Sequence, residues 1–357
     1  MVINLNFWKN KKVLLTGHTG FKGSWLSIWL KKLGVELIGF SKDIPTKPSL
    51  FEIAKISEGM TSIYGNIEDF TAIQKVLKEN KPEIVIHMAA QSLVRKSYEE
   101  PINTFATNVM GTVNLLQAVK TTGSTRVLIN ITSDKCYENK GTEKAFSENS
   151  PMGGYDPYSS SKGCAELVTS SFRNSFFNAK EFDDHKLSLS TVRAGNVIGG
   201  GDWAKDRLIP DIINSISNRT PVRIRNIKSI RPWQFVLEPI HGYLLLVEKM
   251  WNNGKNFSES WNFGPEESEC KSVEWILKKI SEECDDKFSW EYDIENNPHE
   301  AKILKLDCTK AKKRLGWHTK LNTDEAIKWT INWYQEYFKR SDMKACTENQ
   351  IDQFTSL

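Results

Sequence analysis

The chain has 357 residues, of which 39% are hydrophobic and 26% are charged, and this composition is typical of a folded protein with one large or two moderate domains. Its longest apolar runs, such as 84–90 and 243–247, are far shorter than the roughly 20 residues that a membrane-spanning helix needs, which excludes an integral membrane protein of the helical class. The start of the chain carries no apolar core of a secretory signal, so we expect a cytoplasmic protein.

The charges exclude further classes of function. The 48 basic and 44 acidic residues leave a net charge of +4 and are spread along the chain, so no nucleic-acid partner is predicted. The six cysteines include no C-x-x-C pair and the six histidines show no metal-binding spacing, so we expect neither a metal site nor a disulfide framework. The 12 tryptophans predict anchors of a core or an interface.

The first half of the chain alternates short β-branched runs with amphipathic segments. We expect strands at 13–16, 35–40, 84–88 and 127–132 and helices at 24–32, 71–78 and 104–119. Such an alternation predicts an α/β fold, in which crossover helices connect the strands of a parallel sheet.

The second half is less regular. Expected strands at 187–193 and 222–224 mix with expected helices at 208–217, 239–249, 273–283 and 323–338. We therefore predict a first domain at 1–185 and a smaller mixed α/β lobe at 186–340 that is partly interleaved with it. Residues 341–357 are polar, and we expect them to form a frayed tail.

A glycine-rich turn follows the first expected strand and opens a helix. Its residues are Gly17, Gly20, Phe21 and Gly23. Glycines at this spacing allow a pyrophosphate to approach the backbone, and the free N–H groups of the helix start stabilise its charge, so the turn predicts a Rossmann-type, doubly wound fold. Asp43 lies 20 residues past Gly23, where an acid binds the ribose hydroxyls of NAD. Lys42 beside it could instead meet the phosphate of NADP, and Asp43 could be a plain loop acid.

Tyr158 and Lys162 form the second constellation. Asp156 and Pro157 are an N-cap residue and a first helical residue, so the tyrosine and lysine, four apart, share one helix face. A phenol needs its pKa lowered by roughly 3 units, about 4 kcal/mol, to act as a base at neutral pH, and a nearby ammonium and a cationic nicotinamide could supply this. Y-x-x-x-K also occurs by chance on helix surfaces.

Polar residues follow two further strands. Ser133, Asp134 and Lys135 come directly after the run at 127–132, where open α/β sheets bind ligands, although they could also form a solvated loop. His87 ends another strand, and the small residues Ala89 and Ala90 after it leave room for a cofactor. We interpret His87 as a core histidine with satisfied hydrogen bonds, because no partner at acid–base or metal spacing is visible.

These features together resemble the extended short-chain dehydrogenase/reductase family, and within it the nucleotide-sugar 4,6-dehydratases. The resemblance covers nearly the whole chain and is greatest to the branch that acts on CDP-glucose. It is carried by the segments GHTGFKGSW at 17–25, PSLF at 48–51, HMAAQSLVRKS at 87–97, TNVMGT at 107–112, TSDKCY at 132–137, PMGGYDPYSSSKGCA at 151–165, RAGNVIGGGDW at 193–203, RPWQFVLE at 231–238 and WNFGP at 261–265.

The resemblance implies roles for the catalytic residues. Tyr158 matches the active-site base, and Lys162 matches its partner, which also binds the nicotinamide ribose. Ser133 matches the residue that hydrogen-bonds the sugar O4. Asp134 and Lys135 match the pair that performs the elimination, which is Asp-Glu in the deoxythymidine-sugar enzymes. A lysine must be neutral to accept a proton, so the resemblance leaves the C5 base open.

The resemblance also implies binding residues. On the cofactor side, Asn108 is the structural asparagine, and Asn66 and Ile67 stand where relatives have Asp-Ile at the adenine site. The expected substrate contacts are Gln91, Arg95, Asn196, Arg207, Leu208, Arg231 and Trp233. Residues 298–302 replace a phosphate-binding arginine of the deoxythymidine-sugar enzymes, so Arg207 and Arg231 would hold the diphosphate unless they are plain surface arginines.

The implied activity is an NAD-dependent, redox-neutral lyase reaction, with CDP-glucose as substrate and CDP-4-keto-6-deoxyglucose as product. We expect a homodimer or homotetramer that pairs through 104–119 and 157–177, with a place in deoxysugar synthesis for lipopolysaccharide O-antigen. Alternatives are a 4-epimerase, a dehydratase for another nucleoside diphosphate glucose, or a dinucleotide-binding regulator without catalysis.

Overall fold

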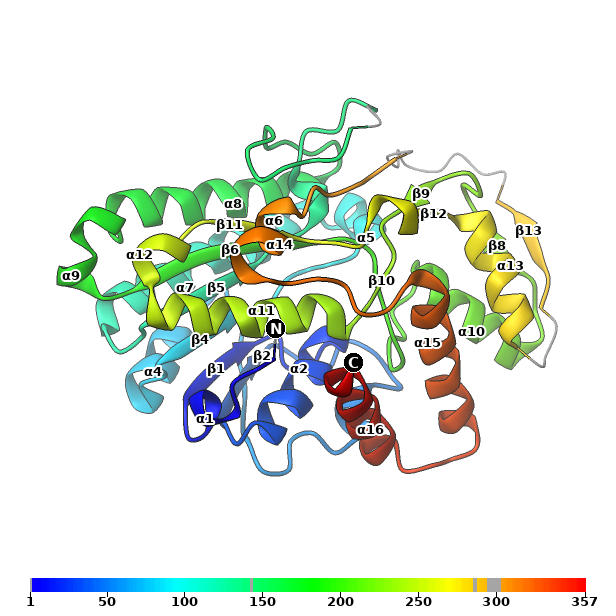
Figure 1. Ribbon diagram of the computed structural model, residues 1–357, viewed down its shortest axis with the longest axis horizontal. Coiled ribbons are helices and arrows are strands. Elements are labelled where there is room, and N and C mark those ends of the chain that lie inside the picture. Colours follow the sequence, from blue (N-terminus) through cyan, green and yellow to red (C-terminus); the bar gives the residue numbers. More distant parts are fainter. Residues whose placement is uncertain (1, 142–143, 285–287, 294–302) are drawn as a thin grey trace.

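A seven-stranded parallel sheet forms the centre of the molecule in the computed structural model, which describes residues 2–141, 144–284, 288–293 and 303–357 (Figure 1). Its strand order is β11-β6-β5-β4-β1-β2-β3. The strands are β1 (Lys12–Thr16), β2 (Glu36–Ser41), β3 (Thr61–Tyr64), β4 (Ile84–His87), β5 (Val127–Ile131), β6 (Ser188–Ala194) and β11 (Ser260–Phe263). The predicted Rossmann-type α/β class is confirmed.

Alternation along the strands separates two hydrophobic layers. Leu14 of β1 packs with the helices on one face, whereas its neighbours Val13 and Leu15 belong to the layer on the other face. The first face carries α4 (Phe70–Asn80), α7 (Gly111–Thr122) and α8 (Pro157–Ser175), and the second carries α2 (Phe21–Lys32), α11 (Leu237–Asn252), α15 (Thr323–Phe338) and α16 (Met343–Ser356). The sheet is therefore buried on both faces, as expected for parallel strands.

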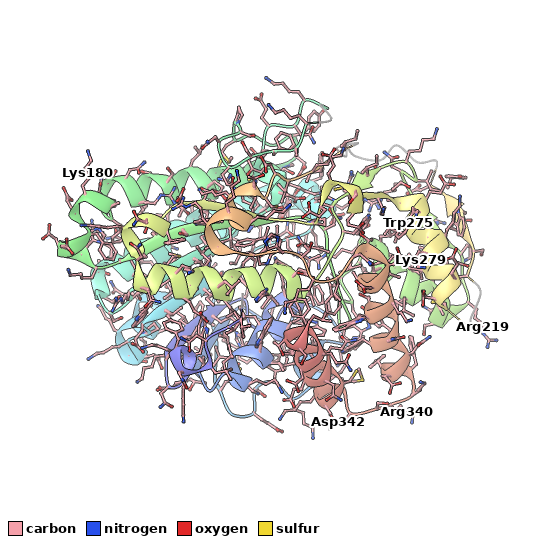
Figure 2. All side chains as sticks on the ribbon, in the orientation of Figure 1. Lys180, Arg219, Trp275, Lys279, Arg340 and Asp342 are labelled. Atoms are coloured by element: carbon pink, nitrogen blue, oxygen red, sulfur yellow. The ribbon has the colours of Figure 1, made fainter. Side chains whose placement is uncertain are left out.

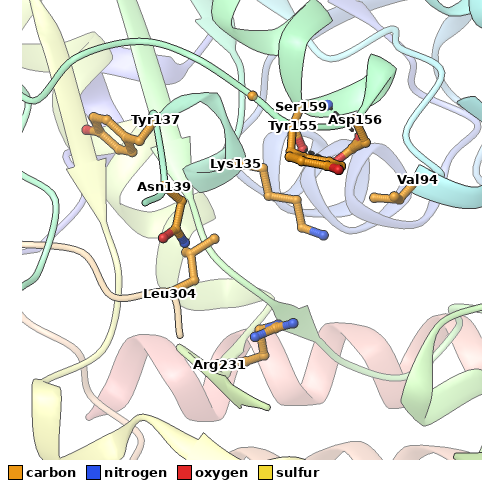
Figure 3. Close-up of a pocket in the computed structure, with 10 residues that line it drawn as sticks. Val94, Lys135, Tyr137, Asn139, Tyr155, Asp156, Ser159, Arg231 and Leu304 are labelled. Atoms are coloured by element: carbon orange, nitrogen blue, oxygen red, sulfur yellow. Dashed lines mark hydrogen bonds between the residues drawn. The ribbon is translucent and has the colours of Figure 1, made fainter. Parts of the chain in front are cut away.

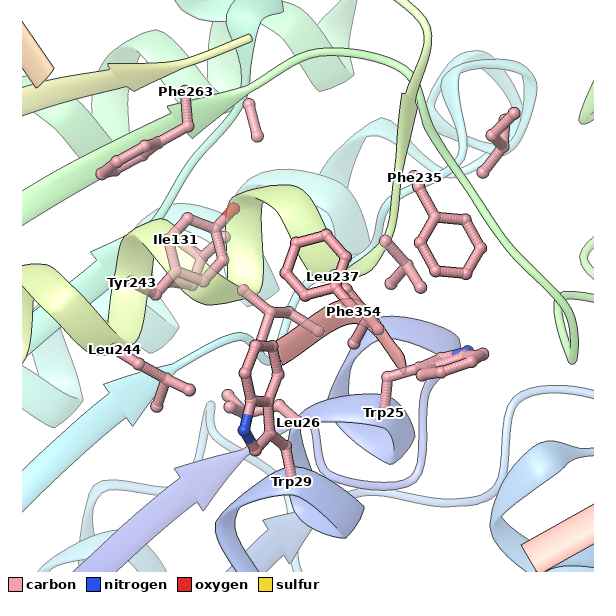
Figure 4. Packing of buried hydrophobic residues seen from close by; sticks show 14 of the residues in the cluster. Trp25, Leu26, Trp29, Ile131, Phe235, Leu237, Tyr243, Leu244, Phe263 and Phe354 are labelled. Atoms are coloured by element: carbon pink, nitrogen blue, oxygen red, sulfur yellow. The ribbon is translucent and has the colours of Figure 1, made fainter. Parts of the chain in front are cut away.

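Aromatic side chains fill the layer below α11. Figure 4 shows Trp29 of α2 beside Phe354 of α16, with 6.0 Å between their ring centroids, and Trp25 of α2 beside Phe235, with 5.8 Å between theirs. The fully buried tryptophans are Trp8, Trp25, Trp29, Trp261, Trp317 and Trp333, which confirms their prediction as core anchors. Charged side chains such as Lys180, Arg219 and Arg340 point outward instead (Figure 2).

The predicted boundary at residue 185 cuts through the sheet. β6 pairs with β5 along Val127–Ile131, and β11 then pairs with β6, so two strands from the second half of the chain complete the first domain. Sequence alone predicted interleaving but not its extent, because parallel pairing joins strands that lie far apart in the chain.

The prediction of a frayed tail at 341–357 is wrong. These residues contain the helix α16, whose N-cap Asp342 accepts hydrogen bonds from the backbone N–H groups of Lys344 and Ala345. Its apolar side chains Met343, Ile351 and Phe354 are buried against α2 and α15. A few apolar residues at helical spacing are sufficient to dock an otherwise polar helix.

The second lobe is built from short elements around α10 (Leu208–Asn218) and α13 (Val273–Glu283). Its strands are β7 (Val197–Ile198), β8 (Val222–Ile224), β9 (Ile230–Arg231), β10 (Gln234–Phe235), β12 (Lys271–Ser272) and β13 (Trp290–Tyr292). The remaining short helices are α1 (Leu5–Trp8), α3 (Leu50–Ile53), α5 (Val94–Glu99), α6 (Pro101–Phe105), η1 (Ala106–Met110), η2 (Asp134–Cys136), η3 (Ala179–Glu181), α9 (Phe182–His185), α12 (Gly254–Phe257), η4 (Glu267–Glu269) and α14 (Thr309–Leu315).

The strand order reverses between β1 and β4. From β1 the chain moves outward to β2 and β3, and then returns to place β4 on the other side of β1. Ligands of open α/β sheets bind at such a switch point, beyond the carboxyl ends of the strands. None of the helices in the described ranges is both long enough and apolar enough to cross a membrane.

Candidate active site

The glycine turn joins β1 to α2 with almost no free space. Gly17 has a φ of +77°, and a Cβ added to it would lie 2.8 Å from the backbone nitrogen of Ala89. A Cβ on Gly23 would lie 2.1 Å from the carbonyl oxygen of Gly17. Gly20 is the N-cap of α2, and Phe21 is its first residue. The backbone thus leaves a close approach to the start of α2, which fits a pyrophosphate.

His87 is buried at the end of β4 with both ring nitrogens engaged. The Thr16 hydroxyl lies 2.7 Å from Nδ1 and the Thr112 hydroxyl lies 3.4 Å from Nε2. Burial, together with the charge of Lys162, lowers the pKa of His87 to about 3. The interpretation as a core histidine is confirmed. Ala89 and Ala90, which follow it, are half-buried at the same edge of the sheet.

The expected adenosine contacts lie on the other side of the turn. Asp43 is exposed just after β2, and its backbone carbonyl accepts a hydrogen bond of 2.6 Å from the Thr19 hydroxyl of the turn. Asn66 follows β3, and its Oδ1 accepts from the Glu68 backbone N–H at 3.1 Å. Ile67 is buried, and its carbonyl accepts from Asn114 Nδ2. All three residues remain predicted cofactor contacts.

Tyr158 and Lys162 lie on α8 as predicted. The Asp156 carboxylate caps this helix, accepting from the Ser159 backbone N–H at 2.9 Å and from the Ser159 hydroxyl at 2.6 Å. Burial raises the pKa of Tyr158 to about 12, even though a hydrogen bond with Ser133 lowers it. The lowering expected of a catalytic phenol therefore does not come from the protein alone, because the loss of hydration outweighs the neighbouring cations.

Lys162 is held by groups of opposite or partial negative charge. Its ammonium donates to the carbonyl of Ile131 at 3.3 Å, and burial lowers its pKa to about 8 while Glu166 raises it. Glu166, one helical turn further on, is paired with Arg193 at 2.7 Å and accepts from the hydroxyls of Thr132 and Thr191. Sequence analysis missed Glu166, although its spacing of four residues from Lys162 is a usable signal.

Asp134 is a buried carboxyl, and one of its two oxygens has no hydrogen-bond partner in the described residues. The Ser133 hydroxyl donates to Oδ1 at 3.1 Å, whereas Oδ2 has no hydrogen-bond partner in the described part of the chain. Burial raises the pKa of Asp134 to about 6, against the lowering effects of Lys135, Ser133 and Arg231. A carboxyl with this pKa can be protonated near neutral pH and can then act as a general acid.

Lys22 and Tyr243 extend this site and were not predicted. The Lys22 ammonium, in the first turn of α2, donates to the Tyr243 hydroxyl on α11 at 3.4 Å. Burial lowers the pKa of Lys22 to about 7, with Lys162 and Arg207 adding to the effect and Asp134 opposing it. A lysine inside a glycine turn is the only local signal for this pair, because Tyr243 comes 221 residues later.

A pocket opens next to this cluster (Figure 3). Lys135 and Arg231 project toward it from two different segments, so an anionic ligand would be favoured there. The full lining consists of Val94, Lys135, Tyr137, Asn139, Gly154, Tyr155, Asp156, Ser159, Arg231 and Leu304.

The three arginines predicted to contact the substrate are ordered by neighbouring groups. Arg207 pairs with Asp202 at 2.8 Å and donates to the Ser92 hydroxyl at 2.9 Å. Arg95 pairs with Asp206 at 3.2 Å. Arg231 is buried on β9, and its guanidinium donates to the carbonyl of Ile230. These arginines are therefore held in place rather than loose on the surface. Residues 298–302 lie outside the described residues.

Gln91 and Trp233 have their polar groups directed into the protein. The Gln91 amide donates to the carbonyl of Leu93 and to the Thr104 hydroxyl, and its Oε1 accepts from the Leu93 backbone N–H. The Trp233 indole donates to the carbonyl of Lys271 at 3.0 Å. These hydrogen bonds orient both side chains, and their contact with the substrate stays a prediction.

Three further predicted site residues come from other segments of the chain. Asn108, in the π-helical turn η1, bonds both backbone groups of Gln91 and donates to Ser161 of α8 at 2.9 Å. Asn196 follows β6 and is half-buried, and Leu208 begins α10 and packs against the core. Asn108 thus ties the loop after β4 to the helix that carries Tyr158.

Comparison with known proteins decides the family. A family model described as GDP-mannose 4,6 dehydratase matches residues 14–330. The chain belongs to this family. It is 53% identical over 355 residues to a CDP-glucose 4,6-dehydratase of Salmonella typhimurium, covering 99% of both chains. It is 25% identical to a dTDP-glucose 4,6-dehydratase of Xanthomonas campestris pv. campestris, covering 90% of this chain and 92% of that protein.

Solved structures of other proteins have the same fold as this chain. The epimerase Mth375 of Methanothermobacter thermautotrophicus superposes with a TM-score of 0.80 at 22% identity, covering 94% of this chain and 95% of that one. The dTDP-glucose 4,6-dehydratase of Bacillus anthracis in complex with NAD superposes with a TM-score of 0.76 at 20% identity, covering 94% and 99%. At these identities the two structures support the Rossmann-type fold.

Proposed function

We propose that this dehydratase converts CDP-glucose to CDP-4-keto-6-deoxyglucose and water in an NAD-dependent, redox-neutral reaction. The observation that carries the proposal is the buried Asp134, which lies next to Lys135 and is hydrogen-bonded to Ser133, which in turn bonds Tyr158. A 4-epimerase needs the tyrosine and lysine alone, whereas loss of water from C5 and C6 needs an acid and a base. The 53% identity to a CDP-glucose 4,6-dehydratase supports the nucleotide.

The cofactor has a defined set of candidate holders. The pyrophosphate would lie at the start of α2, which the glycine turn at Gly17, Gly20 and Gly23 positions; Asp43 would bind the adenosine ribose, and Lys162 would bind the nicotinamide ribose. When bound, NAD would supply the acceptor for the C4 hydride and its later donor to C6, and its positive charge would favour the phenolate of Tyr158.

Each proton transfer is assigned to a different side chain. Tyr158 removes the proton of the C4 hydroxyl, which Ser133 orients, and the resulting ketone acidifies the C5 proton. Lys135 removes that C5 proton in its neutral form and later returns it. Asp134, in its protonated form, donates to the departing C6 hydroxyl, so that water leaves. Arg207 and Arg231 would bind the diphosphate, for which guanidinium groups are suited.

The test uses purified enzyme and CDP-glucose. We expect a 4-keto-6-deoxy product with no net formation of NADH. Stoichiometric NADH would contradict a redox-neutral reaction, and a product that keeps its C6 oxygen would identify a 4-epimerase. Parallel turnover of CDP-, UDP-, GDP- and dTDP-glucose tests the nucleotide, and a preference for any base other than cytosine would overturn the CDP assignment.

We also propose a homo-oligomer that pairs through the segment around α6, η1 and α8. Large apolar side chains are exposed there: Ile102 is 85% exposed, Met110 52% and Leu167 59%. Exposed apolar patches of this kind mark protein interfaces. Light scattering after gel filtration would test it, and a monomer at micromolar concentration would contradict it. The cytoplasmic location and the place in deoxysugar synthesis stay predictions from the sequence.

A further inference from the structure

The proposed reaction, on which this inference rests, leaves two side chains in the wrong protonation state after each turnover. Tyr158 takes the proton of the C4 hydroxyl, and the product keeps its C4 ketone, so that proton is never returned to the sugar. Asp134 gives a proton to the C6 hydroxyl, which departs as water. The C5 proton is removed and replaced, and therefore cancels. Before the next turnover Tyr158 must lose one proton and Asp134 must gain one.

A single hydroxyl contacts both of these groups. The Ser133 hydroxyl donates to Asp134 Oδ1 at 3.1 Å and is hydrogen-bonded to Tyr158. Its position is fixed, because Ser133 has an extended backbone before η2 and its oxygen accepts from the Lys135 backbone N–H at 3.2 Å. A hydroxyl can accept one hydrogen bond while it donates another, which is the arrangement that a proton relay requires.

All three members of this chain are buried. Ser133 is 7% exposed, Asp134 is 3% exposed and Tyr158 is 8% exposed, so the protein itself limits exchange of their protons with bulk water. Asp134 Oδ2 is buried and has no hydrogen-bond partner among the described residues. A half-turn about χ2 of the aspartate exchanges its two oxygens, and this torsion is roughly two-fold.

We propose that Ser133 passes the proton from Tyr158 to Asp134 and so resets the site between turnovers. The O–H bond of Tyr158 breaks as an O–H bond forms on the Ser133 oxygen, and the original Ser133 proton moves to Asp134. Ser133 is unchanged, one negative charge moves from the carboxylate to the phenolate, and no electrons are gained or lost. The substrate's own C4 proton thus becomes the proton that a later turnover places on the departing hydroxyl.

Lys22 offers a rival source for the second proton. Its charge acts on Asp134, and its ammonium donates to Tyr243, which is also close enough to Asp134 to be affected by its charge. A proton from Lys22 would recharge Asp134 but would not remove the proton from Tyr158. The two routes therefore predict different sensitive residues.

The first test measures kcat of Ser133→Ala and Ser133→Thr against the concentration of a small buffer such as imidazole, at fixed pH and ionic strength. We expect kcat of Ser133→Ala to fall on the order of a hundredfold and to rise with buffer concentration, because external buffer then replaces the relay. Wild type and Ser133→Thr, which keep the hydroxyl, should not respond to buffer. A slow Ser133→Ala that ignores the buffer would overturn the relay, since Ser133 would then only orient the sugar.

Lys22→Met is the matched variant for the rival route. A buffer response in Lys22→Met together with none in Ser133→Ala would assign the proton to Lys22 and overturn the proposal. Absence of a 4-keto-6-deoxy product with wild type would instead contradict the proposed function itself, before any buffer is varied.

A second measurement needs no turnover. Binding of NAD to weakly buffered enzyme is followed with a pH indicator dye, comparing wild type with Asp134→Asn. As Tyr158 ionises, the relay lets Asp134 keep the proton in wild type, whereas Asp134→Asn must release it to solution. Equal release from the two proteins would overturn the relay. Matching thermal midpoints and cofactor stoichiometries check that both proteins are folded.

Discussion

Two pairs of buried side chains at the candidate site differ in how completely they are hydrogen-bonded. One pair is His18 and His87 beside the glycine turn, and the other is Asp134 after β5 and Tyr158 on α8. His18 has Ser41 and Ser62 hydroxyls at 2.8 and 2.7 Å from its two ring nitrogens, and burial lowers its pKa to about 4. His87 is likewise bonded at both nitrogens. Asp134 has one oxygen without a partner in the described residues, and the Ser133 hydroxyl that bonds its other oxygen is also hydrogen-bonded to Tyr158.

The difference lies in hydrogen-bond saturation. Burial disfavours the charged form of all four groups. The histidines are neutral and have no nitrogen left for a ligand, so they stabilise the turn. Asp134 and Tyr158 can still exchange protons with a substrate. A buried titratable side chain whose hydrogen bonds are all formed thus has a structural role here, whereas a buried side chain with one unpaired atom is a candidate for catalysis.

The largest effect is expected for Tyr158→Phe. Because the phenolate is the base that we propose for the C4 hydroxyl, we expect kcat to fall by at least about a thousandfold. Binding of NAD, followed by fluorescence titration, should stay within a few-fold of wild type. Retention of a tenth or more of the activity would mean that the active site is misplaced.

The second largest effect is expected for Asp134→Asn. It should lower the rate of dehydration on the order of a hundredfold or more, because an amide cannot donate an acidic proton to the departing hydroxyl. Oxidation at C4 does not use this carboxyl, so reduced nicotinamide should accumulate on the enzyme and be visible in the near ultraviolet. A dehydration rate near that of wild type would remove Asp134 from the elimination.

The same substitution should stabilise the fold at neutral pH. The folded carboxyl has its pKa raised from 3.8 to about 6, so its contribution to stability is fully present below about pH 4 and is lost as pH rises to about 6. Removing the charge should therefore raise the free energy of unfolding by up to about 3 kcal/mol at pH 7. Urea titrations at pH 4 and pH 7 measure this, and a gain that is equal at both pH values would contradict it.

The smallest effect is expected for His87→Gln, which tests whether the histidines differ from Asp134 and Tyr158 in having only a structural role. Loss of the bond to Thr16 should lower the free energy of unfolding by about 1–2 kcal/mol. Because His87 does not titrate between pH 5 and 8, the limbs of the kcat–pH profile should keep their positions. A shifted limb would show that His87 takes part in proton transfer and would break the comparison.

Local sequence patterns were sufficient to predict part of this site. The glycine turn, the Asp156 cap with Tyr158 and Lys162, and the polar run after the strand at Val127–Ile131 each depend on neighbouring residues, and the structure places them at one edge of the sheet. The raised pKa of Tyr158, the Lys22–Tyr243 contact and the docking of α16 depend on burial by distant segments. No local pattern encodes such burial, so these were missed or wrongly predicted.

The interleaved sheet has a consequence for how the chain is made. β6 lacks its outer neighbour until β11, at Ser260–Phe263, has left the ribosome, and α16 can close against α2, where Lys32 pairs with Asp352, only after its own residues have followed. During most of translation an unpaired strand edge and the apolar surface around Trp29 are exposed, which invites chaperone binding and aggregation. Truncation near residue 185 would remove β6 as well and leave the edge of β5 permanently open, so a separately expressed first domain should be insoluble.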